Sequence, residues 1–518
     1  MLKTLGGKND DMGLDIVSDK QGNSYFIGSY MDTVSFGDTT YISKGYSDPF
    51  IIKKDSEGNL VWMRTIIGNS VKDLSGIAID PDDNIYVTGM FRGKLFIGND
   101  TLSSAGYLDV YIVKINTNGE FLWAKQGGGS GSDRPRGISA DNQGNCYVIG
   151  DFEENIIFGS TTIINNGNLD IFIAKLNTDG DFVWAKGAGG SSLDYGIAIA
   201  ADAQGNCYIT GTDGGESKFG NITLPYFAHK DIFIAKLNAS GDFIWAKRVN
   251  GEGYFDQGNS IQVDAQNNIY VTGQYSLKAN FGDISLTNSG YTGYDDAFIT
   301  KLDANGNFIW AKSIGGEDDD NGRKIVVDFM GNSYITGSYS STALFGSDTL
   351  ESNGEEDAFI TKLDANGNFL WARNIVGGPG KDVGLSLTLG LAGDIIVTGY
   401  FTDTASVGAD TLKGNGRADV FFAGFCNDSD FSSSINKPLS PLSSVNIYPN
   451  PVSGVLTLET MQQTTGTFTI IDMKGAVVYQ GTLVSGKSTI DLAMLTNGLY
   501  LLKSYSNKEI ICRKFLKN

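Results

Sequence analysis

One strand motif recurs seven times in this chain of 518 residues and restricts it to a repeat architecture. Its pattern is Gly-Asn-x-Tyr-Val/Ile-x-Gly, and successive copies lie 61 to 64 residues apart. Internal repetition at such a period is typical of propellers and solenoids, in which each unit buries its apolar face against its neighbours. The copies end at Gly28, Gly89, Gly150, Gly211, Gly273, Gly337 and Gly399.

Each copy is expected to contribute four short strands. An apolar strand such as 76–80 precedes the motif, a third strand opens with Asp as at 109–114, and the fourth ends in Trp-Ala-Lys. All six tryptophans occupy this last position, so we expect them to fill the space between neighbouring sheets rather than to form a ligand platform. They are Trp62, Trp123, Trp184, Trp245, Trp310 and Trp371.

The phase of the repeat predicts how the fold closes. Residues 1–7 align with residues 310–316, so the chain starts on a fourth strand, which the seventh copy lacks. We therefore expect the N-terminal strand to complete the seventh unit and leave no open sheet edge. The pattern resembles the bacterial family of seven-bladed β-propeller repeat proteins. That resemblance implies an all-β protein with a closed seven-bladed β-propeller over residues 1–426, but no particular activity, because propellers host unrelated functions.

A second domain follows a change in composition. Residues 427–444 crowd Asp, Ser and Pro as in a linker, and residues 445–518 fit a small Ig-like β-sandwich. Tyr-Pro-Asn-Pro at 448–451, the strand 498–503 and the basic end 514–518 resemble the type A C-terminal sorting domain of type IX secretion. The alternative is an ordinary Ig-like module.

The resemblance to a sorting domain implies a partner and a location. The partner is the type IX secretion machinery, which would bind residues 445–518. The location is the outside of a Gram-negative bacterium, with the protein either secreted or held at the outer-membrane surface. Such cargo carries an N-terminal signal peptide, whereas residues 1–7 contain no apolar h-region, so we expect the N-terminus to be truncated.

Charge and composition exclude several classes of partner. The formal net charge of −20 argues against nucleic acid and anionic membrane surfaces, because both bind through clustered Lys and Arg. No apolar run is long enough for a transmembrane helix. Cys146 and Cys207 occupy equivalent positions 61 residues apart and are expected to be small buried side chains rather than parts of a disulfide or metal framework. We expect a monomer.

Two rings of aspartates recur with the repeat. One precedes the first strand and the other opens the third. We favour a structural role, because short Asp side chains accept hydrogen bonds from loop N–H groups, and we assign no metal site. The same rings could instead bind Ca²⁺, although even the densest cluster, 317–320, lacks the ligand spacing of an EF-hand. The first ring is Asp11, Asp133, Asp194, Asp256, Asp320 and Asp382, and the second is Asp48, Asp109, Asp170, Asp231, Asp296, Asp357 and Asp419.

Departures from the consensus are the candidates for ligand binding. Propeller connectivity places the loops before the first strand and those between the second and third strands on one face. Exposed aromatics beside Arg could stack on sugar rings or contact a protein partner; the alternative is that they pack these loops locally. The candidates are Arg134, Arg136, Tyr195, Tyr226, His229, Tyr254, Phe255, Tyr291, Tyr294 and Arg323.

These features favour a binding or adhesion module over two alternatives. An extracellular glycosidase or lyase would need two non-repeated carboxylates with altered pKa values at the channel mouth. A purely structural scaffold would present an evenly polar face. His229 is the only histidine, and no nucleophile–base set or nucleotide-binding glycine motif stands out, so we assign no catalytic residue and no cofactor.

Overall fold

A computed structural model describes residues 2–36, 39–43, 47–290, 293–390, 393–407, 410–414, 416–425, 445–448, 452–460, 466–472, 477–484, 486–506 and 509–517. Every element in these ranges is a β-strand. The chain separates into two compact bodies, one covering residues 1–388, 396–407 and 411–423, and the other containing the C-terminal residues 424–518. The expected linker, 427–444, lies outside the described residues.

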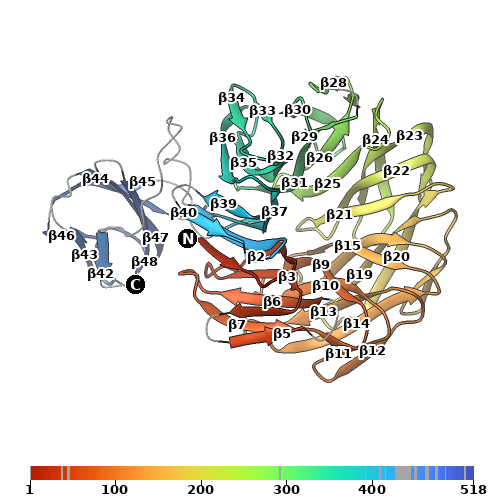
Figure 1. Ribbon diagram of the computed structural model, residues 1–518, viewed down its shortest axis with the longest axis horizontal. Helices are drawn as coiled ribbons and strands as arrows, with labels where there is room; N and C mark the ends of the chain where they lie inside the picture. The colour runs from red at the N-terminus through yellow and green to blue at the C-terminus, as the bar shows by residue number, and fades with distance from the viewer. Residues whose placement is uncertain are drawn as a thin grey trace. The chain divides into compact units, whose positions relative to one another are not determined.

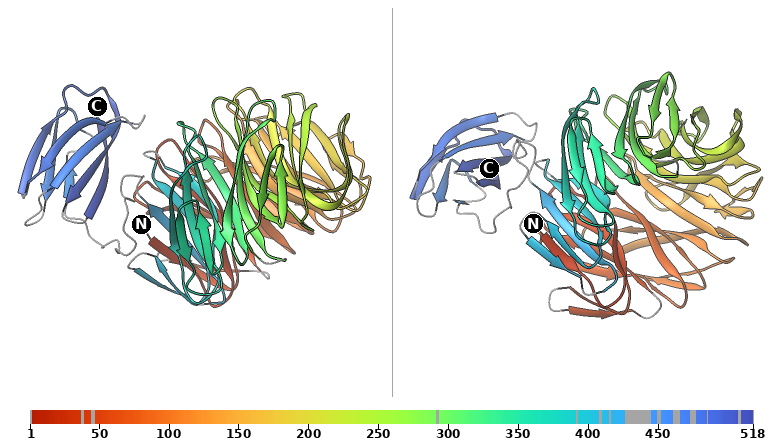
Figure 2. Two further views of the ribbon diagram at one scale, coloured as in Figure 1. Left: turned by 90° about the horizontal axis from the view of Figure 1, so that it is seen from above. Right: turned by 45° about the horizontal axis from the view of Figure 1, so that its top comes forward.

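The first body contains seven four-stranded antiparallel repeats within the described ranges. Figures 1 and 2 show the repeats following one another, with the first strands toward the middle of this body and the fourth strands toward its rim. Six repeats run in chain order, and their strands are β2 (Asp11–Ser18), β3 (Ser24–Tyr30), β6 (Asp48–Lys54) and β7 (Leu60–Thr65); β9 (Lys72–Ile79), β10 (Ile85–Phe91), β13 (Asp109–Ile115) and β14 (Phe121–Gly129); β15 (Asp133–Ala140), β16 (Cys146–Phe152), β19 (Asp170–Leu176) and β20 (Phe182–Gly190); β21 (Tyr195–Ala201), β22 (Cys207–Phe219), β23 (Ile222–Leu237) and β24 (Phe243–Gly251); β25 (Gln257–Val263), β26 (Ile269–Ser276), β29 (Asp295–Leu302) and β30 (Phe308–Gly316); β31 (Asp320–Val327), β32 (Ser333–Tyr339), β35 (Asp357–Leu363) and β36 (Phe369–Val376).

The seventh repeat combines the two ends of the first body. Its strands β37 (Asp382–Leu389), β38 (Ile395–Phe401) and β41 (Asp419–Phe425) are joined by β1 (Leu2–Leu5), which pairs antiparallel with β41. Leu2 lies opposite Ala423, and Leu5 lies opposite Val420. The edge of β41 that the chain order leaves open is therefore paired.

The core of this body lies between successive sheets. The third strands β13, β19 and β35 are buried at every position, because each is covered by a neighbouring sheet on both faces. One cluster combines Tyr86 and Val110 of the second repeat with Cys146 and Phe172 of the third. Cys146 and Cys207 are free, fully buried thiols.

We expected loops between the second and third strands, but these segments have regular structure. Most of them form short β-hairpins, and four of these hairpins pair with strands of the preceding repeat, as β17 does with β14 and β27 with β24. In the fourth repeat, β22 and β23 continue without a break into this hairpin. The short strands are β4 (Thr33–Phe36), β5 (Thr39–Ile42), β8 (Ile67–Gly68), β11 (Lys94–Ile97), β12 (Asp100–Ser103), β17 (Ile156–Phe158), β18 (Thr161–Ile163), β27 (Lys278–Phe281), β28 (Ile284–Thr287), β33 (Thr342–Phe345), β34 (Asp348–Glu351), β39 (Thr404–Val407) and β40 (Asp410–Lys413).

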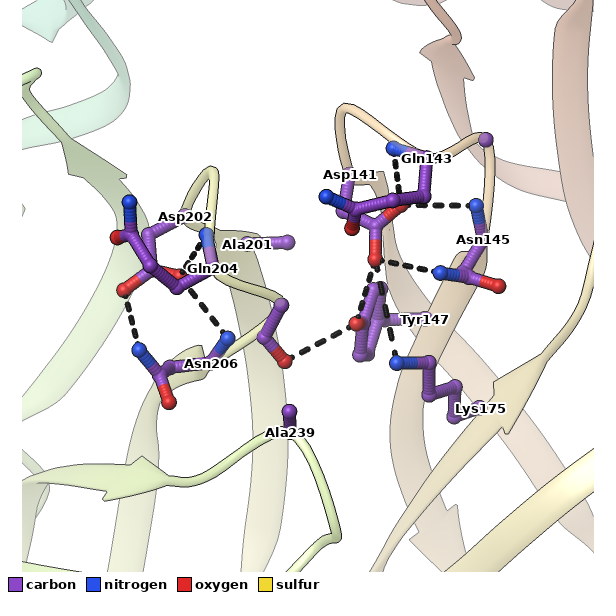
Figure 3. Close-up of polar contacts among 12 residues, drawn as sticks. Asp141, Gln143, Asn145, Tyr147, Lys175, Ala201, Asp202, Gln204, Asn206 and Ala239 are labelled. Atoms are coloured by element: carbon purple, nitrogen blue, oxygen red, sulfur yellow. Dashed lines mark hydrogen bonds and ion pairs between the residues drawn. The ribbon is translucent and has the colours of Figure 1, made fainter.

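Side chains also tie each repeat to the next. Asp141 accepts hydrogen bonds from the backbone N–H groups of its own turn and from Tyr147, whose hydroxyl also lies 3.0 Å from the carbonyl oxygen of Gly205 in the following repeat (Figure 3). Trp123 Nε1 donates to the Thr178 carbonyl at 3.0 Å. The tryptophans are therefore part of the repeat-to-repeat contact, as expected.

The second body has two sheets around one apolar core. The sheets run in the order β42-β43-β46 and β45-β44-β47-β48, and both contribute to a cluster that includes Leu456, Phe468, Ile490 and Phe515. Two sheets sharing a core make a β-sandwich. Its strands are β42 (Val445–Tyr448), β43 (Val455–Thr460), β44 (Gly466–Asp472), β45 (Val477–Leu483), β46 (Gly486–Asp491), β47 (Gly498–Ser506) and β48 (Glu509–Lys517).

Candidate functional site

The first strands of six repeats carry a β-bulge at the same position. In the third repeat, Pro135 lies opposite Gly150 and Gly137 opposite Ile149, so Arg136 has no partner on the second strand. A bulge leaves one residue outside the ladder and redirects its side chain. The bulge residues are Leu14, Ser75, Arg136, Ile197, Asn259 and Arg323.

Several bulge residues meet around one pocket of about 450 Å³. Its volume lies in the range of small-molecule sites. The wall combines apolar, amide and guanidinium groups from the third to seventh repeats. The lining residues are Arg136, Tyr195, Ile197, Phe255, Gln257, Asn259, Arg323 and Leu385. A hollow of about 580 Å³ between the second and third repeats is lined by Gly128, Phe182 and other residues, none of them a sequence candidate.

On one side of the pocket, two arginines share a buried carboxylate. Arg136 Nε donates to Asp151 Oδ1 at 2.8 Å, and Arg134 Nη1 lies 3.5 Å from Asp151 Oδ2 and Nη2 3.2 Å from Glu153 Oε1. Asp151 is fully buried, so this pairing compensates its charge. Both Nη groups of Arg136 make no hydrogen bond to any residue that the structure describes, which leaves donors available to a ligand.

Arg323 provides a second guanidinium group in the pocket. Its Nε is buried and has no hydrogen-bond partner among the described residues. Burial lowers the pKa of Arg323, while Glu356 and Tyr400 act in the opposite direction. Glu356 also binds Lys381 Nζ at 2.8 Å, so its charge is shared between two cations. A ligand anion would therefore meet an incompletely compensated positive charge here.

Aromatic rings form the next part of the wall. Tyr195 and Phe255 meet edge-to-face with their centroids 6.2 Å apart, and Lys230 Nζ lies 5.7 Å and 5.4 Å from these two centroids. Close by in the chain, His229 packs against Tyr254, which is 83% exposed. The rings next to the pocket are thus held in place by each other and by a cation.

The structure brings together only part of the predicted site. Arg136, Tyr195, Phe255 and Arg323 line the pocket, and Arg134 supports Arg136 through Asp151. The other candidates are not among the lining residues. Tyr226 and Tyr254 are exposed, His229 contacts Phe227 and Tyr254, Tyr294 is partly exposed, and Tyr291 lies outside the described residues.

Sequence reasoning missed four lining residues: Ile197, Gln257, Asn259 and Leu385. Ile197, Asn259 and Leu385 occupy the same repeat position as Arg136 and Arg323. Comparing this position across the seven copies would have identified these three residues. The residue type at this position differs between repeats, whereas the glycine before it is kept in most of them.

Outside the pocket lining, one carboxylate links several repeats. Asp15 Oδ1 accepts hydrogen bonds from Lys324 Nζ at 2.7 Å and from Ser386 Oγ at 2.6 Å, and Asp15 Oδ2 accepts one from Ile77 N–H at 3.2 Å. These residues belong to the first, second, sixth and seventh repeats. Asp15 thus gives the first strands a common polar contact.

The repeated aspartates do accept backbone hydrogen bonds, as the structural interpretation predicts. Asp133 Oδ2 accepts the Gly129 N–H at 2.7 Å, and Asp109 accepts those of Ala105 and Gly106. Asp133 Oδ1 has no hydrogen-bond partner among the described residues.

Comparisons with known proteins identify two parts of the chain. Residues 446–518 match the model of the secretion system C-terminal sorting domain, and residues 309–338 match the model of a beta-propeller repeat. The chain therefore contains a β-propeller repeat and, at its C-terminal end, a type IX secretion sorting domain. The sorting domain implies a secreted or outer-membrane-surface protein. Among the described residues, no helix is long and apolar enough to cross a membrane.

More distant relatives add little to this identification. An uncharacterized WD repeat-containing protein of Acanthamoeba polyphaga mimivirus is 25% identical over an alignment 472 residues long, which covers 71% of this chain and 34% of the viral protein. The chain therefore spans about a third of the length of this curated relative.

The solved structures that resemble this chain have low sequence identities and low TM-scores. A gluconolactonase of Xanthomonas campestris has 11% identity and a TM-score of 0.29, covering 66% of this chain and 90% of its own. A mutant apocarotenoid oxygenase of Synechocystis has 11% identity and a TM-score of 0.37, covering 81% and 93%. A puromycin hydrolase has 9% identity and a TM-score of 0.35, covering 87% and 59%. At these scores the likenesses carry no argument about activity.

Proposed function

We propose that this protein is an exported binding module that recognises saccharides carrying an acidic group outside a Gram-negative cell. The observation that carries the proposal is the meeting of Arg136, Arg323, Tyr195 and Phe255 around one pocket. None of these four residue types is required by the repeat at its position. They gather in space although they come from different repeats.

The chemistry of the wall supports a ligand of this class. Guanidinium groups bind carboxylate or sulfate through paired N–H donors, and both arginines retain N–H groups without a partner in the described chain. Aromatic rings supply the flat apolar surface on which a sugar ring stacks. The side chains of Gln257 and Asn259 can donate to and accept from hydroxyl groups.

We also infer that the seven repeats close into a seven-bladed propeller over residues 1–426, followed by a linker at 427–444 and an Ig-like sorting sandwich at 445–518. Three contacts support closure: β1 pairs with β41, the Asp11 N–H donates to the Ala418 carbonyl at 2.9 Å, and Ser386 binds Asp15. The first contact brings the N-terminal strand into the seventh repeat, and the other two join the seventh repeat to the first.

The pocket favours binding over the two alternatives. A glycosidase or lyase would need a pair of carboxylates beside the substrate, and the described residues that line this pocket include no Asp, Glu or His. Asp151 lies behind the wall, where two arginines hold it. A scaffold without a ligand would have no use for uncompensated donors beside exposed aromatics.

The test measures binding of the full chain to an array of neutral, uronate-containing and sulfated saccharides. We expect saturable binding to acidic members. Removing one charged hydrogen-bond donor should weaken binding by about 10- to 100-fold. Arg323→Gln and Tyr195→Ala are the test variants, and Tyr226→Ala, which changes an exposed ring outside the pocket, is the control.

Each outcome bears on a different part of the proposal. Equal binding of neutral and acidic members would refute the role of the arginines. Binding that Arg323→Gln and Tyr195→Ala leave unchanged would place the site elsewhere. Absence of glycan binding, with capture of a purified surface protein instead, would replace the saccharide by a protein partner. Turnover of a bound saccharide would favour the enzyme.

A further inference from the structure

Aspartates of consecutive repeats meet at the boundary between the two repeats. The third strand of one repeat and the first strand of the next run side by side at their starts, where a parallel bridge joins Lys230 to Phe255 and another joins Glu356 to Lys381. The residue that follows each bridge partner is an aspartate. We call such a pair an aspartate junction. Two of them are Asp231–Asp256 and Asp357–Asp382. A third is Asp296–Asp320, where the N–H of the preceding Asp295 donates to Asp319 Oδ1 at 3.0 Å.

All six carboxylates of these junctions are fully buried. Each uses one oxygen to accept hydrogen bonds, as Asp231 Oδ1 does from Gly251 N–H at 3.0 Å and Asp256 Oδ1 does from Ser276 N–H at 3.0 Å. The second oxygen of each has no hydrogen-bond partner within the described part of the chain. No described Lys or Arg forms an ion pair with any of the six.

At the junction Asp231–Asp256, the two carboxylates reach the same small space. A Cβ atom placed on Gly251 would lie 2.0 Å from Asp256 Oδ2 and 3.3 Å from Asp231 Oδ1. The equivalent boundary one repeat earlier is similar, since a Cβ on Gly189 would lie 2.6 Å from Asp170 Oδ1 and 2.9 Å from Asp194 Oδ2. Glycine at these positions leaves the space between the oxygens free of side-chain atoms.

At one boundary, a lysine of the chain itself supplies a positive charge. Between the first and second repeats, Lys72 replaces the second aspartate at the start of β9. Its Nζ lies 2.8 Å from Asp48 Oδ1, and both side chains are buried. At this boundary the lysine ammonium group stands where the other boundaries have a second carboxylate.

Two buried carboxylates without a cation are costly to the folded state. Moving an unpaired charge out of water costs several kcal/mol, and two like charges repel each other more strongly in a medium of low dielectric constant. Fully buried aspartates with one unpartnered oxygen among the described residues recur at three consecutive boundaries, so a compensating positive charge at each is the simplest explanation.

We propose that the aspartate junctions Asp231–Asp256, Asp296–Asp320 and Asp357–Asp382 each bind one Ca²⁺ ion, and that Lys72 replaces this ion between the first two repeats. The ions would hold neighbouring repeats together, a role separate from the saccharide pocket.

The donor set selects the class of cation. All donors are oxygens, which suit hard divalent ions, and Ca²⁺ accepts the irregular mixtures of carboxylate, carbonyl and water that a strand boundary can offer. Mg²⁺ requires near-ideal octahedral geometry and retains several waters, which fits fully buried carboxylates less well. No group of three or more potential ligating side chains occurs among the described residues, so the other ligands would be backbone carbonyls or water.

The test counts ions on the full chain. Protein is purified in Ca²⁺, freed of loose ions by gel filtration and measured by atomic emission, and its thermal transition is recorded in Ca²⁺, in Mg²⁺ and in EGTA. We expect bound calcium and a lower melting temperature in EGTA that Ca²⁺ but not Mg²⁺ restores. Asp256→Asn should remove one ion per chain.

Matched variants at the Lys72 boundary separate ion binding from general destabilisation. Asp48→Asn removes the equivalent aspartate beside Lys72 and should leave the ion count unchanged. Lys72→Asp rebuilds a carboxylate pair with Asp48 and should add one ion. If Asp256→Asn does not fold, Asp320→Asn and Asp382→Asn test the same loss at the other junctions.

Three results would overturn the proposal. The first is a purified chain without calcium whose melting temperature is the same in Ca²⁺ and EGTA. The second is an equal ion count in Asp256→Asn and Asp48→Asn. The third is stability that ignores Ca²⁺ but falls as pH rises, which would mean that each junction holds a shared proton instead of an ion.

Discussion

The hydrogen bond that joins Tyr147 to the next repeat has a matched control within the same chain. Tyr147 and Tyr25 occupy the same repeat position and are both fully buried. Each hydroxyl contacts the aspartate of its own turn, at 2.8 Å for Asp141 and 3.1 Å for Asp19. Of these two hydroxyls, the one of Tyr147 also donates to a carbonyl of the following repeat, that of Gly205 at 3.0 Å, whereas that of Tyr25 has no such contact among the described residues.

Removing the hydroxyl should therefore cost more at Tyr147 than at Tyr25. Both Tyr→Phe variants lose a bond to a carboxylate, a loss of about 1.5–3 kcal/mol. Tyr147→Phe in addition leaves the buried Gly205 carbonyl without that donor, which costs about 1–3 kcal/mol when the group stays unpaired. Since one proton is divided between two acceptors, we expect the lower part of this range, about 1–2 kcal/mol, as the difference between the variants.

The free energy of unfolding is measured by urea denaturation followed through tryptophan fluorescence, which reports this region because Trp184 lies 6.1 Å from the Tyr147 ring. The m value should be the same in both variants, so that the midpoint alone carries the difference. Equal losses for Tyr147→Phe and Tyr25→Phe would refute the reasoning, since the contact between repeats would then contribute nothing.

Two further predictions concern closure and export. If β1 completes the seventh repeat, replacing Leu2–Leu5 by a Gly/Ser segment of equal length should lower the melting temperature of the first body, and a synthetic peptide of residues 1–9 should restore part of it; an unchanged transition in differential scanning calorimetry would contradict closure. A passenger carrying a signal peptide and residues 427–518 should reach the exterior of a type IX-competent cell, as judged by protease accessibility; retention in the periplasm would show that this segment is insufficient for sorting.

Sequence alone predicted the repeat and most of its strands because both follow from short-range patterns. The Asp that opens each third strand and the Trp of the fourth recur at fixed spacing, and β13 begins at Asp109 as expected. The short hairpins were missed because strands of three or four residues with mixed exposure, such as β17, do not stand out from a polar loop.

The site was harder to predict for a different reason. Whether Arg136 lies in the ladder or outside it depends on the register between β15 and β16, and a shift of one residue moves a side chain to the other face. The meeting of Asp231 with Asp256 depends in turn on the contact between two repeats. Neither relation is visible in the pattern of one strand, although repeat alignment does place these residues at equivalent positions.

In six of the described first strands, the bulge frees one residue from strand pairing while its neighbours keep the strand paired. The residues on either side of Arg136 pair with β16, whereas Arg136 itself has no partner there. Under the proposed function, mutation at this position changes the pocket wall while the backbone pairing on either side is kept. After duplication of one ancestral repeat, this position would have been free to diversify separately in each copy, so that a new specificity could arise by single substitutions. An engineer could likewise substitute the bulge residue of a repeat without changing the residues that pair the strands.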